Sequence, residues 1–92
     1  MYDLINKILE KSKKENVDIG VAYDMLVSEN GADENLKDAW EFLQENQTEI
    51  HKLRNAGREN EIKVLCNMAV AKDERAIRKY LIALYDEGII ER

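Results

Sequence analysis

The chain contains no proline, and only four of its 92 residues are glycine. These two residues disfavour a helix interior most strongly, whereas Leu, Ala, Glu and Lys, which recur throughout this sequence, favour it. Apolar residues return every three or four positions, which is the spacing of one face of a helix. The sequence therefore predicts an all-α protein whose helices end at glycines or at short polar breaks.

The periodicity predicts five helices, over residues 3–14, 19–29, 34–55, 59–69 and 73–87. Asp18 and Asp33 are candidate N-caps of the second and third helices, because an aspartate there accepts a hydrogen bond from the first turn. The third helix has a broad apolar arc, so we expect it to pack on two sides, between the N-terminal helices and the C-terminal part of the chain. The last helix is expected to end at Gly88, and Ile89 and Ile90 suit a short strand.

A chain of this length is expected to form one small domain. Within it, residues 1–32 are predicted to form an acidic pair of helices and residues 33–92 a three-helix unit. No segment has the roughly 20 apolar residues needed to cross a bilayer. The N-terminus also lacks the pattern of a secretory signal, so we expect a cytoplasmic protein.

Charge is distributed unevenly along the chain, whose net charge is −5. Residues 1–50 hold five lysines and twelve acidic residues, whereas residues 51–80 hold eight basic and four acidic residues. A local cationic patch can bind phosphates even where the whole protein is acidic. The sequence thus combines an acidic half with a basic segment.

The basic segment coincides with two predicted helices, 59–69 and 73–87, which are joined by a short turn at residues 70–72. In a helix-turn-helix, the second helix lies in the major groove of DNA. Helical spacing puts Ile77, Tyr80, Leu81 and Leu84 of the second helix on a buried face. Its exposed face is expected to carry Arg75, Arg78, Lys79 and Ile82. Arginine can read a guanine edge, lysine a phosphate or guanine, and isoleucine a thymine methyl group, although an exposed isoleucine can also mark a protein contact.

Several segments of the C-terminal half follow one known pattern. They are Gly57-Arg58-Glu59-Asn60, Ile62-Lys63, Leu65-Cys66-Asn67-Met68, Asp73 to Leu81, Leu84 and Gly88-Ile89-Ile90. With this pattern, residues 50–92 resemble the winged-helix modules of small regulators and phage proteins of Gram-positive bacteria. The resemblance implies DNA-reading roles for Arg75, Arg78 and Lys79. The full set of candidate DNA-binding residues is Lys72, Arg75, Arg78, Lys79, Ile82, Arg58 and Lys63.

The sequence departs from the winged-helix pattern in two places. The turn is one residue longer than usual and has no glycine, and the chain stops at Arg92, where a wing would need a second strand. We therefore expect a five-helix domain with a wingless or truncated winged-helix core.

The other chemically versatile residues favour structural roles. Cys66 lies on an apolar stripe, which predicts a buried and inert thiol. His51 is the single histidine, and no cysteine or second histidine lies at a spacing that would let the two bind a metal together. Trp40, Phe42, Tyr80 and Tyr85 are expected in the core. No catalytic set, phosphate loop or metal-ligand spacing is present, so we expect neither an enzyme nor a cofactor or metal.

The sequence leaves two functions open. The first is a small DNA-binding transcription regulator that reads double-stranded DNA with helix 73–87 and is a homodimer, because one helix-turn-helix gains affinity by pairing on a two-fold site. The second is a small acidic inhibitor or adaptor of phage origin that binds another protein through its acidic N-terminal half. In that case the cationic residues of helix 73–87 are simply a solvated helix face.

Overall fold

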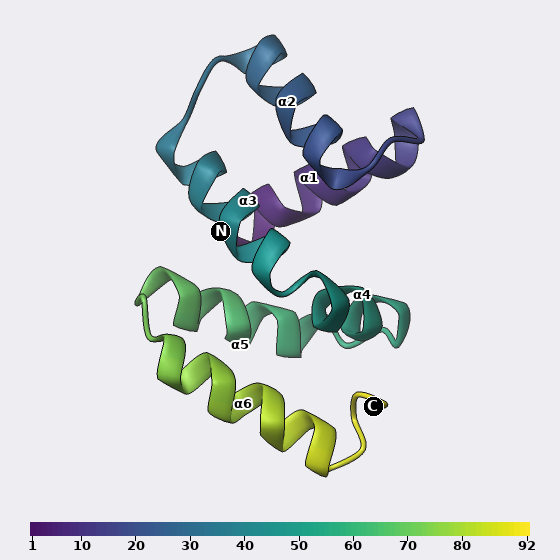
Figure 1. The fold of residues 1–92 in the computed structure, drawn as a ribbon, viewed down its shortest axis with the longest axis vertical. Helices are drawn as coiled ribbons and strands as arrows, with labels where there is room; N and C mark the ends of the chain where they lie inside the picture. Colours follow the sequence, from purple (N-terminus) through teal and green to yellow (C-terminus); the bar gives the residue numbers. More distant parts are fainter. The chain divides into compact units, whose positions relative to one another are not determined.

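A computed structural model describes residues 1–92, and all of its regular structure is helical (Figure 1). The helices are α1 (Tyr2–Glu15), α2 (Ile19–Asn30), α3 (Glu34–Glu45), α4 (Gln47–Asn55), α5 (Glu59–Val70) and α6 (Glu74–Asp86). They form two compact units, Met1–Glu45 and Asn46–Arg92. The prediction of an all-α chain is confirmed. None of the helices has the length and apolar character needed to cross a membrane.

The long helix predicted over residues 34–55 is two helices, so the structure has six helices instead of five. The break is at Asn46, whose backbone angles (φ −120°, ψ 25°) are not helical. Asparagine competes with the helix for backbone hydrogen bonds and therefore weakens a helix interior. Because α3 packs against α1 and α4 packs against α5, the broad apolar arc belongs to two helices with different partners.

The first unit is built around α1, which packs against both α2 and α3. Each helix contributes residues at helical spacing to its core. The buried side chains are Ile5, Ile8, Leu9, Ile19, Ala22, Leu26, Leu36, Ala39, Phe42 and Leu43. Phe42 is thus a core residue, as predicted, whereas Trp40 is only half-buried.

Polar contacts fix the ends of the helices in this unit. The carboxylate of Asp18 accepts a hydrogen bond from the Val21 N–H at 3.0 Å, and that of Asp33 accepts one from the Asn35 N–H at 2.8 Å. Both candidate N-caps therefore hydrogen-bond to the first turns of their helices. At the end of α1, Asn16 takes a left-handed conformation (φ 54°), which lets the chain turn sharply into α2.

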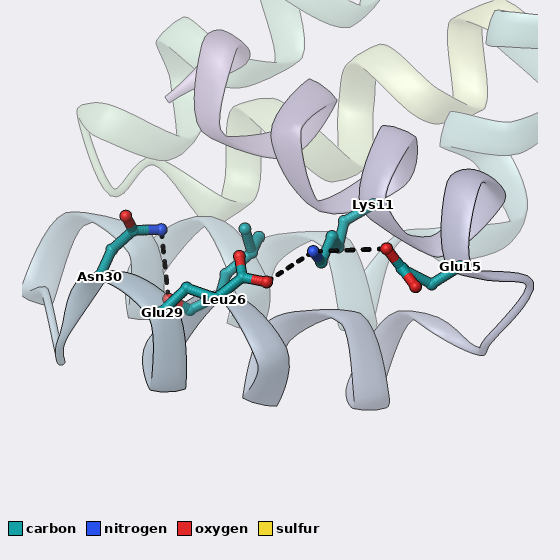
Figure 2. Close-up of polar contacts among 5 residues, drawn as sticks. All are labelled: Lys11, Glu15, Leu26, Glu29 and Asn30. Carbon is teal, nitrogen blue, oxygen red and sulfur yellow. Dashed lines mark hydrogen bonds and ion pairs between the residues drawn. The ribbon is translucent and has the colours of Figure 1, made fainter.

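Lys11 connects α1 to α2 (Figure 2). Its ammonium group lies 2.7 Å from a carboxylate oxygen of Glu29 on α2 and 3.6 Å from one of Glu15 on its own helix. The hydrogen bond to Glu29 raises the pKa of Lys11 above its ordinary value. In the last turn of α2, the Asn30 amide donates to the Leu26 carbonyl at 3.4 Å.

In the second unit, α5 packs against both α4 and α6. The buried side chains are Ile50, Leu53, Ile62, Leu65, Cys66, Ile77, Leu84 and Ile90. Tyr80, Leu81 and Tyr85 were expected in this core, but all three are only half-buried.

The predicted strand at Ile89 and Ile90 is absent. Gly88 has φ +75°, which only glycine adopts without strain, and its N–H and that of Ile89 bond to the carbonyls of Tyr85 and Leu84 at 3.1 and 2.9 Å. This left-handed turn wraps the chain back over the end of α6. Ile90 consequently enters the core, with 2% of its surface exposed, and does not extend into a strand.

The two leucines that face this core differ in burial, which predicts different costs of truncation. Leu65 is fully enclosed, so Leu65→Ala is expected to lower the free energy of unfolding by about 2–5 kcal/mol. Leu81→Ala removes a half-buried side chain and is expected to cost only about 1 kcal/mol. Urea unfolding of the two variants measures both changes, and equal losses would contradict this assignment of the core.

Candidate nucleic-acid interface

Three residues, Ala71, Lys72 and Asp73, form the turn between α5 and α6. Val70, which was expected in the turn, is the last residue of α5. Lys72 occupies the left-handed region (φ 57°) where glycine is usual, and its N–H bonds to the Ala69 carbonyl at 3.0 Å. The turn therefore forms without a glycine, because Lys72 adopts the left-handed conformation that the turn requires.

Asp73 hydrogen-bonds to both helices. Its N–H bonds to the Met68 carbonyl at 3.0 Å and so closes the end of α5. Its carboxylate accepts a hydrogen bond from the Ala76 N–H at 3.0 Å, and its carbonyl accepts one from Ile77 at 3.1 Å. The same residue therefore ends the turn and begins α6.

Packing of one side of α6 in the core leaves its other side chains in solvent. Ile77 and Leu84 are buried, whereas Arg75, Arg78 and Lys79 are exposed. The cations are exposed as predicted, but of the four residues predicted on the buried face only Ile77 and Leu84 are buried, and Tyr80 and Leu81 are half-buried. Ile82 lies among the three cations at helical spacing and is 57% exposed. We call Arg75, Arg78, Lys79 and Ile82 the cationic arc.

No ion pair neutralises the cations of this arc. The ion pairs described in the structure involve neither Arg75, Arg78 and Lys79 nor the adjacent Lys72. The carboxylate of Asp86, farther along α6, is paired with Arg92 at 2.7 Å. The middle of α6 therefore presents unpaired positive charge around an apolar side chain.

Two of the candidate residues lie apart from the others. Arg58 precedes α5, and Lys63 lies in its second turn. A helix of 12 residues is about 18 Å long, so Arg58 is at the opposite end of α5 from the turn. Arg58 also pairs with Glu61 at 3.5 Å. Lys72 thus lies next to the arc in the turn, whereas Arg58 and Lys63 are exposed elsewhere on the unit.

A cluster around Tyr85 was not predicted from the sequence. The Lys52 ammonium lies 5.5 Å and the Arg92 guanidinium carbon 5.3 Å from the centre of its ring. Lys52 also donates a hydrogen bond to the Glu91 carbonyl at 2.6 Å. Burial, followed by the nearby carboxylate of Glu49, raises the pKa of Tyr85.

This cluster adds to the edge of the candidate interface. Tyr85 follows Ile82 by three residues and Arg78 by seven, so it lies on the same side of α6. Lys52 comes from α4 and brings a further cation beside that side. No pattern in the sequence signals it, because Lys52 and Tyr85 meet only through the packing of the unit.

The single cysteine and the single histidine have different environments. Cys66 is buried in the core and His51 is exposed on α4. No group of three or more His, Cys, Asp or Glu side chains is placed to hold a metal ion. Burial raises the pKa of the Cys66 thiol from 9.0 to about 11, so it stays protonated and unreactive at neutral pH.

No protein-family model, no curated protein and no solved structure matches this chain. The side chains of the interface themselves indicate what it could bind. Arg75 and Arg78 can each donate paired hydrogen bonds to a guanine edge or a phosphate, and the lysines can donate to phosphates. Ile82 can contact a methyl group or another apolar surface.

The buried thiol predicts how stability changes at alkaline pH. Because the pKa of Cys66 is raised in the folded state, the folded protein holds this proton more tightly than the unfolded chain. The free energy of unfolding is therefore expected to fall as the pH rises from about 9 to about 11. The free energy of unfolding, measured by urea titration at each pH, should decline less steeply for Cys66→Ala than for the wild type. The raised pKa values of Tyr80 and Tyr85 contribute a decline in both proteins, so the difference between them reports on Cys66. Identical slopes would contradict the assignment.

The conformation of Lys72 predicts a stabilising substitution in the turn. A left-handed residue other than glycine costs about 1–2 kcal/mol, and glycine's extra freedom in the unfolded chain costs about 0.5–1 kcal/mol. Lys72→Gly is therefore expected to stabilise the protein by about 0.5–1 kcal/mol in urea unfolding. Lys72→Ala is the matched control, since it removes the same charge and keeps the strained φ, and it should give no gain.

Proposed function

We propose that this chain is a small DNA-binding regulator in which α5, the turn and α6 act as a helix-turn-helix. The observation that carries the proposal is the cationic arc, in which Arg75, Arg78 and Lys79 are exposed and without ion pairs on one face of α6. A turn of three residues is within the range of helix-turn-helix motifs. The resemblance of residues 50–92 to wingless or truncated winged-helix modules supports the same function.

In this function, α5 braces α6, and α6 is the recognition helix that enters the major groove. Residues near the start of a recognition helix contact base edges, which suits Arg75 and Arg78. Lys79 and Lys72 suit phosphates, and Ile82 suits a thymine methyl group. Arg58 and Lys63 would supply outlying phosphate contacts.

The acidic unit restricts how such a protein binds. Residues 1–45 hold five lysines and eleven acidic residues, a net charge of −6, which repels the phosphate backbone. Affinity for random DNA is therefore expected to be weak, so that base contacts matter more. Pairing of two copies on a two-fold site would raise the affinity of a single recognition helix. We place this activity in the cytoplasm, where a transcription regulator of a bacterium or phage acts.

The same charge favours a second candidate function, an acidic inhibitor or adaptor that binds another protein through residues 1–45. A pull-down from host lysate, with and without nuclease, distinguishes the two functions. Partners that are lost after nuclease treatment support DNA binding. Partners that remain bound, and are lost when acidic residues of the first unit are reversed, support the second function.

DNA binding predicts a definite dependence on salt. Log affinity should fall linearly with log salt concentration, with a slope of about −0.9 per phosphate neutralised. With three to five cations of each chain in reach, we expect a slope of about −3 to −5 per chain. Arg78→Ala should relax base preference by about 1–3 kcal/mol if it reads a guanine, or reduce the slope by about one if it binds a phosphate.

Fluorescence anisotropy with random and selected duplexes measures these effects. Lys14→Ala is the matched control, because Lys14 is an exposed cation of α1 outside the arc, and it should leave binding unchanged. Absence of saturable binding to either pool of duplexes at low salt would refute the proposed function.

A further inference from the structure

The cluster around Tyr85 contains one cation that no carboxylate neutralises. The Lys52 ammonium lies 5.5 Å from the centre of the Tyr85 ring and donates a hydrogen bond to the Glu91 carbonyl at 2.6 Å, at the surface of the second unit. None of the ion pairs described in the structure includes Lys52. Arg92, the other cation beside the ring, is paired with Asp86 at 2.7 Å. Lys52 therefore carries the unpaired positive charge of this cluster.

Two contacts hold the Lys52 ammonium in place. A lysine ammonium has three N–H donors, and the Glu91 carbonyl accepts a hydrogen bond from it. The face of the Tyr85 ring attracts the cation electrostatically. A flexible surface lysine loses conformational entropy when it binds a partner, whereas a lysine that is already held loses less. Lys52 is thus a preorganised cation that keeps donors for a further acceptor.

Lys52 lies beside the same side of α6 as the cationic arc. Tyr85 follows Arg78 by seven residues, or almost two turns, so the two side chains leave α6 within about 20° of each other. Arg78 is exposed and Tyr85 is half-buried, which puts Tyr85 at the edge of the arc. Because α4 and α6 belong to the same compact unit, the place of Lys52 beside the arc is fixed by the packing of that unit.

The dimensions of DNA bring phosphates to this place. The major groove is about 12 Å wide, and an α-helix with its side chains is about 10–12 Å across. The two phosphate backbones therefore flank a helix that occupies the groove. A cation that a neighbouring helix holds beside the recognition helix faces one of these backbones. Lys52 of α4 is such a cation, about 10 Å along α6 from Arg78.

We propose that Lys52 binds the DNA backbone, with its ammonium donating to a phosphate oxygen beside the C-terminal part of α6. The Tyr85 ring and the Glu91 carbonyl position it. An ammonium is a point charge and a phosphate is the same at every base pair, so this contact adds affinity without sequence preference. The inference rests on the proposed function, since it needs a duplex held by α6, and it makes α4 a third helix of the interface.

Salt titration of duplex binding tests the contact. Each phosphate contact contributes about 0.9 to the slope of log affinity against log salt. Lys52→Ala should therefore weaken binding to random and selected duplexes alike and make the slope shallower by about one. Lys14→Ala, which removes an exposed cation of α1, is the matched control and should leave the slope unchanged. An unchanged slope for Lys52→Ala, or a loss confined to the selected duplex, overturns the inference.

Substitutions of Tyr85 test its positioning role. Tyr85→Leu removes the ring that attracts the ammonium and should weaken binding to every duplex by about two- to fivefold. Tyr85→Phe is the matched control, because it keeps the ring and loses only the hydroxyl near the Glu49 carboxylate, and it should bind as the wild type does. In a chain that already carries Lys52→Ala, Tyr85→Leu should cause no further loss. Additive losses would overturn the positioning role.

Acetylation of lysines in the wild-type chain, read by mass spectrometry, needs no variant. A saturating duplex should slow acetylation of Lys52 and leave Lys14 as reactive as in the free protein. A duplex that binds with the expected slope but leaves the acetylation rate of Lys52 unchanged refutes this inference alone. A wild-type chain that binds no duplex at low salt refutes the proposed function, and the inference with it.

Discussion

The candidate interface depends on the hydrogen bonds of Asp73. Its N–H closes the last turn of α5, and its carboxylate and carbonyl hold the first turn of α6. An α-helix repeats every 3.6 residues, so the residue at which it begins fixes the direction of every later side chain. With Ile77 and Leu84 buried on one side of α6, Arg75, Arg78 and Lys79 lie on the exposed side.

The second constraint is the separation of charge between the units. Residues 1–45 are strongly acidic, and the cations of α6 have no ion-pair partner. Unpaired cations on a folded surface remain well solvated until a partner of opposite charge replaces that water. The DNA phosphate backbone, which we propose as the partner of the arc, meets this requirement.

Sequence periodicity predicted the helices well where local interactions decide them. Asp18 and Asp33 accept hydrogen bonds from the turns that follow them, and Arg75, Arg78 and Lys79 are exposed as expected. It failed where two outcomes have similar local energies. Asn46 tolerates both a helix interior and a break, and the apolar pair Ile89–Ile90 suits a strand as well as a chain that folds back into the core.

The sequence alone determined that this protein is helical, which side chains share a helix face, and that basic residues outnumber acidic ones over residues 51–80. These features follow from the spacing of residues along one helix and from the absence of proline. The tertiary structure decided that Leu81 and Trp40 are only half-buried and that Lys52 meets Tyr85. Burial and contacts between helices depend on which faces pack together, and residues 33 positions apart carry no local signal of meeting.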